Sequence, residues 1–510
     1  MAIGYARTIA LLGVHGHNVT VEAHVTSAIP AFTIIGLPDA SLSEARDRVR
    51  AAIASAGIEF PQRKITVNLA PASLPKSGST FDLAIAVAIL VAVGALHPEH
   101  VRDTMFIGEL GLDSQLHPVR GVLPAVHAAS QLGVSRVVVP AGNAAEAELV
   151  QNVDVVPVKT LGQCIRLLGG EAPELELYEH AVPDSLHMHT PSQPRDMSEV
   201  VGQESAKYAV EIAAAGGHNL MLIGPPGTGK TMLAQRIVSV LPELTPEQAL
   251  ETASIHSLCG TFSSQHGIST LPPFENPHHT ATGVAIIGGG SGTIRPGAVS
   301  RAHHGILFLD EAPEFSARTL QTLRQPIESG EVVIQRSVGT ATFPARFQLV
   351  IAANPCPCGN AHGSGKQCVC TSLQRRRYMN RLSGPLLDRV DIQVDVLPVA
   401  VGTLHAPTSS SAEMKERITQ ARQRAHSRYA DLPWHTNAQA HGTWIRNHLG
   451  KTSEAIKEVN HLTERGRLSL RGADRVLRVA ATIADLSDES IISVDTIHTA
   501  LALRTRAGDA

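Results

Sequence analysis

A glycine-rich loop near the middle of the chain constrains the fold more than any other feature. Residues 220–223 form a short apolar run, residues 224–231 read GPPGTGKT, and residues 232–240 have helical spacing. A strand, this loop and a helix in that order are the context of the phosphate-binding pattern G-x-x-x-x-G-K-[ST]. Glycines let successive backbone N–H groups point at phosphate oxygens, and the helix N-terminus adds its dipole. The sequence therefore predicts a nucleotide site formed by Gly224, Pro225, Pro226, Gly227, Thr228, Gly229, Lys230 and Thr231.

An apolar strand ending in two acids supplies the second half of this site. We expect Lys230 to neutralise the β- and γ-phosphates of ATP and Thr231 to hold Mg²⁺ through its hydroxyl. Residues 305–309 are an apolar run, and Asp310 and Glu311 follow it directly. In phosphate-loop folds an aspartate at such a strand end helps to hold Mg²⁺. Glu311 is then placed to polarise the attacking water.

Three more polar residues are candidates for contact with the γ-phosphate. Asn354 ends a buried strand and could orient water, although an asparagine there can also be a turn residue. Arg389 could reach the γ-phosphate of a neighbouring subunit, or it could pair with one of the aspartates beside it. Arg471 starts a strongly periodic helix and could sense the γ-phosphate or form a surface salt bridge.

Four cysteines form two C-x-C pairs that are separated by nine residues. They are Cys356, Cys358, Cys368 and Cys370. Four thiolates this close, across a turn-like segment, favour a structural tetrahedral zinc site. Free thiols and a redox switch are the alternatives. A metal site at the paired histidines is disfavoured, because the spacings match no familiar site; these are His278, His279, His303 and His304.

Two insertions interrupt the nucleotide-binding segment. Residues 277–297, with three consecutive glycines at 288–290, indicate a flexible loop. Residues 332–343 have β-branched side chains on both sides of a glycine, which predicts a hairpin with Arg336 and Ser337 near its tip.

Composition limits where the protein acts and what it binds. The 510 residues suffice for about three domains. With a net charge of −3 and 3% aromatic residues, any nucleic-acid contact must be local and cannot rest on a base-stacking platform. Six cysteines do not indicate a secreted disulfide scaffold. The apolar run 83–96 is too short for a membrane span, and the N-terminus lacks a signal-peptide layout, so we expect a soluble cytoplasmic protein.

The chain divides into four parts. Residues 1–170 alternate strand and helix patterns and predict a mixed α/β domain. Residues 171–196 are rich in acids, proline and histidine, including His187 and His189, and indicate a linker. Residues 197–398 hold the nucleotide motifs. Residues 399–510 begin with a Ser/Thr-rich connector and continue as charged helices, which predicts a small helical lid.

Several blocks together resemble the magnesium-chelatase-like YifB/ComM family of AAA+ ATPases. They are GPPGTGKT, GILFLDE, ANPCPCG, SGPLLDRVDI and RVLRVAATIADL, with GLPDASLSEARDRVRAAI near the N-terminus. The resemblance covers nearly the whole chain. It implies an α/β multidomain protein with an AAA+ P-loop αβα core, an α-helical C-terminal lid and an N-terminal Lon-like (ribosomal S5-like) α/β domain. It also implies a homo-hexameric ring with ATP and Mg²⁺ at the subunit interfaces.

The resemblance assigns roles to the candidate residues. Lys230 and Thr231 would be the Walker A pair, Asp310 and Glu311 the Walker B pair, Asn354 sensor 1, Arg389 the arginine finger and Arg471 sensor 2. The hairpin at Arg336 is similar to a pre-sensor-1 hairpin and residues 288–295 to a helix-2 insert, elements that point into the channel of related ring motors. Ala481 stands where the family helix leads us to expect an arginine.

The N-terminal domain resembles the proteolytic domain of Lon-type proteases but departs from it at the catalytic positions. Thr80 stands where that pattern has its nucleophilic serine, and Leu123 stands where it has its lysine. A leucine cannot activate a hydroxyl nucleophile. We therefore expect this domain to be inactive as a peptidase and to serve assembly or recognition.

Family members of the ComM type act as helicases that promote branch migration in homologous recombination and natural transformation. The resemblance thus implies an ATP-driven motor on branched or single-stranded DNA, with recombination proteins as possible partners and no membrane. One alternative is a metal-chelatase motor subunit, although no porphyrin site is evident and a Lon-like domain is not expected in that subunit. The other is a protein unfoldase or protease.

Overall fold

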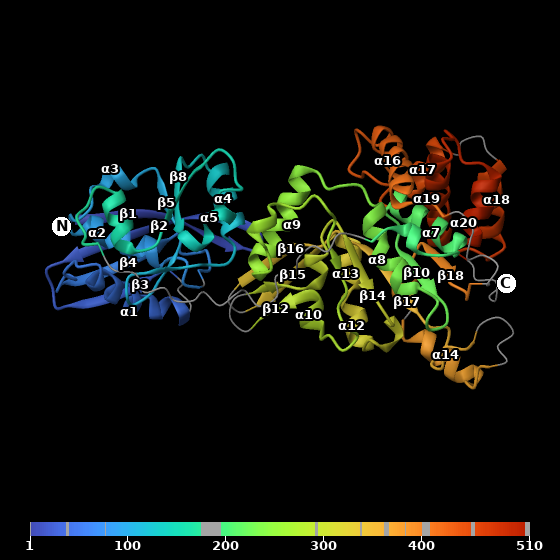
Figure 1. Cartoon of the computed structure of the whole chain (residues 1–510), viewed down its shortest axis with the longest axis horizontal. Helices are drawn as coiled ribbons and strands as arrows, with labels where there is room; N and C mark the ends of the chain where they lie inside the picture. Colours follow the sequence, from blue (N-terminus) through green and yellow to red (C-terminus); the bar gives the residue numbers. More distant parts are fainter. Residues whose placement is uncertain are drawn as a thin grey trace.

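The structure is a computed structural model that describes residues 2–36, 40–76, 78–174, 195–290, 294–336, 339–361, 367–382, 384–399, 408–449 and 454–504. Most of the expected linker, with His187 and His189, and also Ser337, lie outside these residues. Three regions follow one another along the longest axis (Figure 1). They are an N-terminal α/β region, a central region around a parallel sheet, and a bundle of C-terminal helices. This arrangement shows the expected multidomain α/β fold.

The N-terminal region is built on a seven-stranded mixed sheet with the order β3-β4-β2-β1-β5-β8-β9. Strand β2 pairs antiparallel with β1 and β4, and the remaining neighbours are parallel. Every second side chain along the inner part of β2 is buried, as a half-covered sheet requires. The strands are β1 (Ala2–Leu12), β2 (His15–Thr26), β3 (Ala31–Ile35), β4 (Lys64–Ala70), β5 (Thr104–Phe106), β8 (Arg136–Pro140) and β9 (Asp154–Val158), with the small pair β6 (Glu109–Leu110) and β7 (Leu116–His117) beside them.

Helix α2 (Asp82–Ala92) lies at the centre of this region and is buried at every position. Its continuous apolar sequence therefore belongs to a protein core, and no helix among the described residues has the length and apolarity to cross a bilayer. Asp82 is the charged exception. Burial raises its pKa to about 6, against the hydrogen bond from Arg48, whose Nε lies 2.7 Å away. The other helices are α1 (Ala40–Ser55), α3 (Pro98–Val101), α4 (Val122–Gln131), α5 (Ala144–Ala147) and α6 (Leu161–Leu167).

The central region is organised by a five-stranded parallel sheet with the order β11-β14-β17-β10-β18. Because the strands are parallel, their carboxyl ends share one edge of the sheet, where ligands bind in such folds. The strands are β10 (Leu220–Ile223), β11 (Phe274–Glu275), β14 (Ile306–Leu309), β17 (Gln348–Ala353) and β18 (Ile392–Asp395). The helices around them are α7 (Glu204–Gly216), α8 (Lys230–Val240), α9 (Pro246–Cys259), α12 (Ala317–Thr322), α13 (Arg324–Ser329), α14 (Ser372–Asn380) and α15 (Gly384–Leu387).

The C-terminal helices complete the core on one face of the central sheet. Leu220 and Leu222 of β10 belong to a cluster that includes residues of α7, α8 and the C-terminal helices. Met221 and Ile223 face the opposite cluster, with the insertions. Ala481 is 1% exposed in α19, so an arginine there would put a charge into the core. These helices are α16 (Ser411–Arg428), α17 (Gly442–His448), α18 (Glu454–Glu464), α19 (Leu470–Leu486) and α20 (Val494–Ala502).

The first insertion is more regular than expected. It contains α10 (Gly283–Ile287), then β12 (Gly288–Gly289) paired antiparallel with β13 (Arg295–Pro296), and α11 (Ala298–Arg301) follows it directly. The expectation of a flexible loop is wrong for these residues, because two-stranded pairing satisfies their backbone groups. The second insertion is the predicted hairpin, β15 (Glu331–Arg336) with β16 (Gly339–Pro344). The two insertions pack together: a Cβ at Gly289 would lie 3.2 Å from a guanidinium nitrogen of Arg336.

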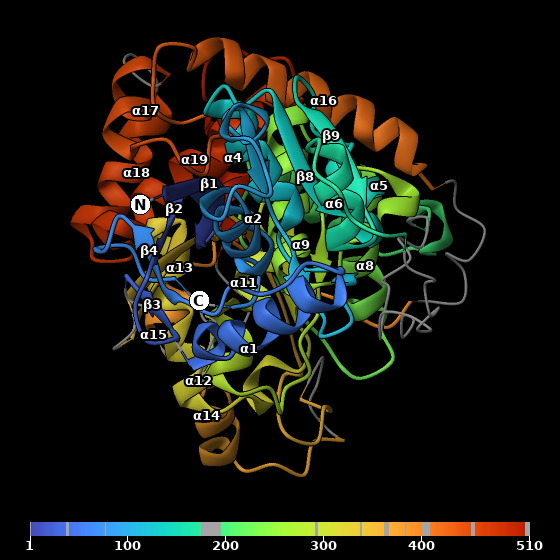
Figure 2. The ribbon, with the colours of Figure 1, turned by 90° about the vertical axis from the view of Figure 1, so that its left-hand side faces the viewer.

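The N-terminal region is docked on α9 (Figures 1 and 2), where Ala253 of α9 joins the apolar cluster that includes residues of α4, and a polar contact adds to this packing. Ser257 Oγ donates to Glu146 at 2.5 Å, and the Gly121 backbone N–H donates to the Ser257 carbonyl at 3.3 Å. A Cβ at Gly13, in the β1–β2 turn, would lie 2.0 Å from the Thr342 carbonyl oxygen of β16. The N-terminal region therefore touches both α9 and the hairpin that carries Arg336.

Candidate active site

The phosphate loop joins β10 to α8 at the carboxyl edge of the central sheet. Gly227 and Gly229 have φ values of +78° and +91°, a conformation that favours glycine. Gly224 is required for space instead, since a Cβ there would lie 2.1 Å from the Val396 carbonyl oxygen. Lys230 is the first residue of α8, so its side chain and the N-terminus of this helix face the same loop.

The ammonium group of Lys230 is held by three oxygen atoms. Its Nζ donates to the carbonyl oxygens of Gly224 and Pro225 at 2.7 and 2.8 Å and to Asn354 Oδ1 at 3.2 Å. Burial lowers the pKa of Lys230, and the charges of Asp310 and Glu311 act in the opposite direction. An ammonium group that is held inside the loop and surrounded by replaceable oxygen acceptors suits a phosphate.

The acidic strand brings the expected metal-binding oxygens together. Thr231 Oγ1 donates to Asp310 Oδ2 at 2.8 Å, although 79 residues separate them in sequence. A hydroxyl and a carboxylate side by side next to a phosphate loop are the protein ligands that Mg²⁺ takes in such sites. The residues present therefore fit Mg²⁺, which would be held by Thr231 and Asp310.

Glu311 occupies a strained backbone position beside these ligands. Its φ and ψ are 49° and 43°, which is uncommon for a residue other than glycine. Its backbone N–H donates to Asp310 Oδ1 at 3.0 Å, and its side chain is 54% exposed. Strain of this kind persists where the surrounding structure fixes it, often at functional sites. Here it turns the carboxylate away from the strand and toward solvent.

The four cysteines lie together directly after Asn354. The Sγ–Sγ distances are 3.4 Å for Cys356–Cys358, 3.7 Å for Cys356–Cys368 and 3.8 Å for Cys358–Cys368, and all four sulfurs lie within 4.8 Å of one another. Zinc–sulfur bonds of about 2.3 Å in a tetrahedron separate the sulfurs by about 3.8 Å. Hydrogen bonds from backbone N–H groups lower the pKa of Cys358 to about 6, and that from Asn360 has the largest effect. The geometry fits zinc, which these four residues would hold.

The cysteine loop also packs on the phosphate loop. A Cβ at Gly359 would lie 2.5 Å from Cδ of Pro226. Because Asn354 precedes the first cysteine by two residues, the cysteine loop is connected to the nucleotide site from two sides.

The hydrogen bonds of His303 disfavour a metal site at His303 and His304. His303 Nε2 and His304 Nε2 lie 3.2 and 2.9 Å from Glu251 Oε2. The backbone N–H of Arg346 donates to His303 Nδ1 at 3.0 Å, so Nδ1 carries the lone pair and Nε2 carries the proton. A metal would need the lone pair of Nε2. The cluster instead ties α9 to the sheet, and the hydrogen bonds from His303 and His304 lower the pKa of Glu251.

Arg389 lies where the strands of the central sheet begin, at the end of the sheet opposite to the phosphate loop. It precedes β18, and the side chain of Asn219, just before β10, donates to its carbonyl oxygen at 2.8 Å. Strand β10 has four residues, so about 13 Å of strand separates this edge from the phosphate loop. The Arg389 guanidinium forms an ion pair with Glu328 of α13. Arg389 therefore lies apart from the nucleotide site of its own chain.

Arg471 lies at the same edge as Arg389. One turn further along α19, Arg475 lies 3.5 Å from Asp391 and donates to the carbonyl oxygen of Val390. Burial lowers the pKa of Arg389, and the charges of Arg324 and Arg471 lower it further. An interpretation in which Arg471 contacts the nucleotide of its own chain does not fit this placement.

Comparison with known proteins places this site in a family. Family models match residues 21–143 (subunit ChlI of Mg-chelatase), 196–404 (magnesium chelatase, subunit ChlI) and 408–504 (magnesium chelatase, subunit ChlI C-terminal). The chain is 46% identical to an uncharacterized protein of Mycobacterium tuberculosis over 505 residues, 99% of each chain. It is 42% identical to the uncharacterized protein YifB of Escherichia coli and 40% identical to the competence protein ComM of Haemophilus influenzae, each over 99% of this chain and 97% of the relative.

The chain belongs to the magnesium-chelatase-like YifB/ComM family. Membership in this family suggests ATPase activity and the use of ATP and Mg²⁺, in agreement with the chemistry of Lys230, Thr231 and Asp310.

The N-terminal region of this YifB/ComM family member has no lysine at position 123. Leu123 is fully buried, and its backbone N–H donates to Glu146 Oε1 at 3.2 Å. Thr80 is half-buried, and its carbonyl oxygen accepts from the Gly108 N–H at 3.1 Å. A buried leucine supplies no base. The absence of peptidase activity remains a prediction.

Sequence reasoning missed two contacts near the site. His279 Nδ1 lies 3.8 Å from Glu311 Oε2, because β11 pairs parallel with β14 and the chain leaves both strands at the same edge. Gln203 donates to the Thr228 carbonyl oxygen of the phosphate loop at 3.3 Å. No local motif marks either residue, since both contacts depend on the strand order.

Proposed function

We propose that this protein is an ATP-driven motor that assembles as a homo-hexamer and translocates DNA, with branch migration in homologous recombination and natural transformation as its task. We expect it to act in the cytoplasm, with recombination proteins as possible partners. The proposal rests on one observation. Lys230, Thr231 and Asp310 converge where the strands of the central sheet end. Arg389 and Arg471 lie at the opposite end, where the strands begin.

The nucleotide edge supports ATP hydrolysis. Lys230 binds the β- and γ-phosphates, and Thr231 and Asp310 hold Mg²⁺, which supplies neutralisation of the charge that develops on the phosphates. Glu311, turned toward solvent, accepts a proton from the attacking water. Asn354 already contacts Lys230 and is close enough to orient that water.

The opposite edge supports assembly of several copies. Head-to-tail contacts between identical chains close into rings when the rotation between copies allows it. In such a ring the edge with Arg389 and Arg471 meets the nucleotide edge of the next copy. Two arginines that cannot serve their own site then stabilise the transition-state charge at the neighbouring one, as arginine fingers supplied in trans do.

The paired insertions support DNA as the cargo. Arg336 of β15 and Arg295 of β13 are exposed on hairpins that pack against each other. Local positive charge of this kind can contact a phosphate backbone although the net charge is −3. The chain also covers almost the full length of a relative that is named a competence protein, in agreement with the natural transformation that we propose as its task.

The alternative is a metal-chelatase motor subunit. The family models carry that name for all three regions, the N-terminal one included. From the sequence we expected the N-terminal domain to argue against a chelatase. Because a chelatase family model matches this domain, it does not. The paired arginine-bearing hairpins favour DNA, and a protein unfoldase remains a third possibility for the same ATP-hydrolysing core.

ATP turnover with different cargoes tests the proposal. We expect the rate to rise several-fold with forked or four-way DNA and not with an unfolded protein. Lys230→Ala should abolish turnover with and without DNA, and Lys457→Ala, which changes an exposed lysine of α18, should leave it unchanged. Stimulation by protein alone would favour an unfoldase. Turnover that no DNA changes would contradict a DNA motor, and undiminished turnover in Lys230→Ala would contradict the nucleotide site.

A further inference from the structure

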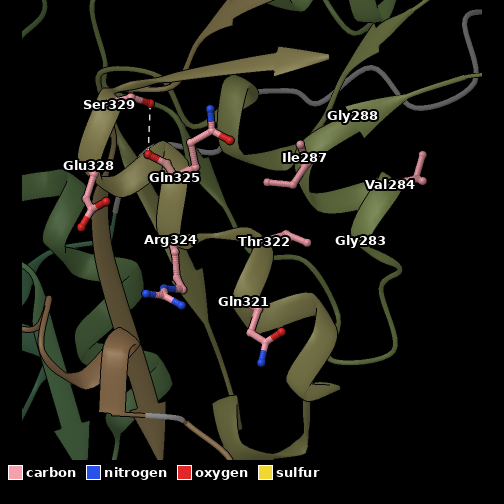
Figure 3. Close-up of a pocket in the computed structure, with 10 residues that line it drawn as sticks. All are labelled: Gly283, Val284, Ile287, Gly288, Gln321, Thr322, Arg324, Gln325, Glu328 and Ser329. Carbon is pink, nitrogen blue, oxygen red and sulfur yellow. Dashed lines mark hydrogen bonds between the residues drawn. The ribbon is translucent and has the colours of Figure 1, made fainter. Parts of the chain in front are cut away.

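A groove of about 680 Å³ lies between α10 and the segment α12–α13 (Figure 3). Gly283, Val284 and Ile287 line it on the α10 side. Arg324 and Glu328 line the α13 side, four residues and thus about one helical turn apart. The groove lies beside Arg389, because Glu328 is the residue with which Arg389 forms its ion pair.

Three guanidinium groups gather beside the groove, where Glu328 supplies a carboxylate. Arg389 pairs with it directly, and Arg324 and Arg471 lie close enough for their charges to lower the pKa of Arg389. Within the described part of the chain, neither Arg324 nor Arg471 forms an ion pair. Like charges held together repel one another, which costs free energy. The cluster therefore has the positive charge of a receptor for an anion richer in charge than a carboxylate.

We propose that Arg324 is a further nucleotide-contacting residue: together with Arg389 it binds the terminal phosphates of the nucleotide held by the adjacent copy, and Glu328 holds Arg389 until that nucleotide arrives. This inference rests on the proposed function, since it requires ATP sites between copies.

The exposure of the three side chains fits this exchange. Arg389 is only 11% exposed, so its surroundings fix its position, whereas Glu328 is 64% exposed. Arg324 is exposed at the rim of the groove. A guanidinium group binds phosphate through two parallel hydrogen bonds, which are stronger than those of a neutral donor. A terminal phosphate thus replaces Glu328 as the partner of Arg389 and gains Arg324 as a second donor.

Turnover of ATP by single variants is the first test. We expect Arg324→Ala to lower kcat at least tenfold. This is less than the about 10³-fold or more that an arginine finger supplies, because Arg389 is still present. Arg318→Ala, which removes the same charge from an exposed position of α12 outside the groove, should remain within twofold of the unchanged protein. An Arg324→Ala protein with normal kcat, next to an inactive Arg389→Ala protein, would overturn this inference and leave the proposed function standing. Normal turnover in both variants would contradict both.

Mixed assemblies show in which copy Arg324 acts. Arg324→Ala lacks the arginine, and Glu311→Gln lacks the base in its own nucleotide site. If Arg324 serves the adjacent copy, a mixture contains interfaces that combine an intact Glu311 with an intact Arg324, and turnover exceeds that of either variant alone. If Arg324 serves its own site, every interface in the mixture lacks one of the two, and no rescue at any ratio would overturn the inference.

The role of Glu328 has its own measurement. Glu328→Gln keeps the size of the side chain and removes the charge that holds Arg389. We expect the KM for ATP to fall at least twofold with kcat retained, because the nucleotide no longer competes with a carboxylate. A raised KM or a lost kcat would show that Glu328 supports the site and does not hold Arg389 in reserve.

Discussion

At the scale of single residues, the role of Glu311 as the base in hydrolysis is the most specific prediction. Its left-handed backbone and its 54% exposed carboxylate place it next to the Mg²⁺ ligands without a role in holding the phosphates. We expect Glu311→Gln to bind ATP normally and to hydrolyse it at least about 100-fold more slowly, since a general base contributes about 10²–10⁴-fold. Equilibrium binding of a fluorescent ATP analogue and single-turnover hydrolysis measure the two effects.

Glu314→Gln is the matched control, because Glu314 follows in the same short segment and pairs with Arg381 at the surface. It should hydrolyse ATP at the normal rate. Rapid hydrolysis by Glu311→Gln would remove this residue as the base.

The sequence predicted the identities of the site residues better than their placement. The motifs that predicted Lys230, Thr231 and Asp310 have a spacing that phosphate and Mg²⁺ binding requires. The structure brings these three residues together. Arg389 and Arg471 carry no such local information. Which edge of the sheet each occupies depends on the order of the strands, and a single sequence does not show that order.

At the scale of elements, the cysteine loop predicts a bound metal. With sulfurs 3.4–3.8 Å apart, we expect freshly purified protein to contain about one zinc per chain by elemental analysis. Cys358→Ser should lose most of it, whereas Cys259→Ser, a cysteine of α9 outside the cluster, should keep it. Less than about half an equivalent in the unchanged protein would count against zinc.

The docking of the N-terminal region on α9 predicts a measurable local stability. Glu146 accepts hydrogen bonds from Ser257, from the Leu123 N–H and from Asn143, and burial raises its pKa. Ser257→Ala removes one donor from a buried carboxylate, at a cost of about 1–3 kcal/mol. We expect amide hydrogen exchange at Gly121 and Leu123 to become about tenfold faster.

Glu148→Ala changes an exposed carboxylate next to the same short helix, and it should leave this exchange unaffected. Equal protection in Ser257→Ala and the unchanged protein would show that the contact does not hold the two regions together.

Elements that an apolar run or a pair of β-branched segments marks in the sequence were predictable, and the others were not. The strands expected at 220–223 and 349–354 and the hairpin expected at 332–343 appear within about one residue of these bounds. The expected loop at 277–297 instead holds α10 and the β12–β13 pair, because glycines such as Gly288 and Gly289 adopt left-handed or extended backbone that pairs across the insertion. Glycine-rich sequence indicates conformational freedom but does not show where packing removes it.

At the scale of the whole molecule, the separation of Lys230 from Arg389 predicts that one chain alone is a poor enzyme. Arg389→Ala should lose most turnover, and mixing it with Glu311→Gln should restore part of it, because each variant supplies what the other's interface lacks. Turnover across mixing ratios measures this. A curve without a maximum would show that Arg389 acts within its own chain.

The same separation sets the order of events that we propose. A nucleotide that binds at one edge completes its site only when the next copy presents its arginines, so hydrolysis reports on contact between copies. The N-terminal region contacts both α9 and the hairpin of Arg336. Movement between copies would therefore carry the hairpins along.

Branch migration of a synthetic four-way DNA junction tests the central claim most directly. We predict that the protein with ATP and Mg²⁺ converts the junction into its duplex products, and that Glu311→Gln binds the junction in ATP without converting it. A protein that hydrolyses ATP in the presence of the junction and leaves it unconverted would contradict a DNA-translocating motor.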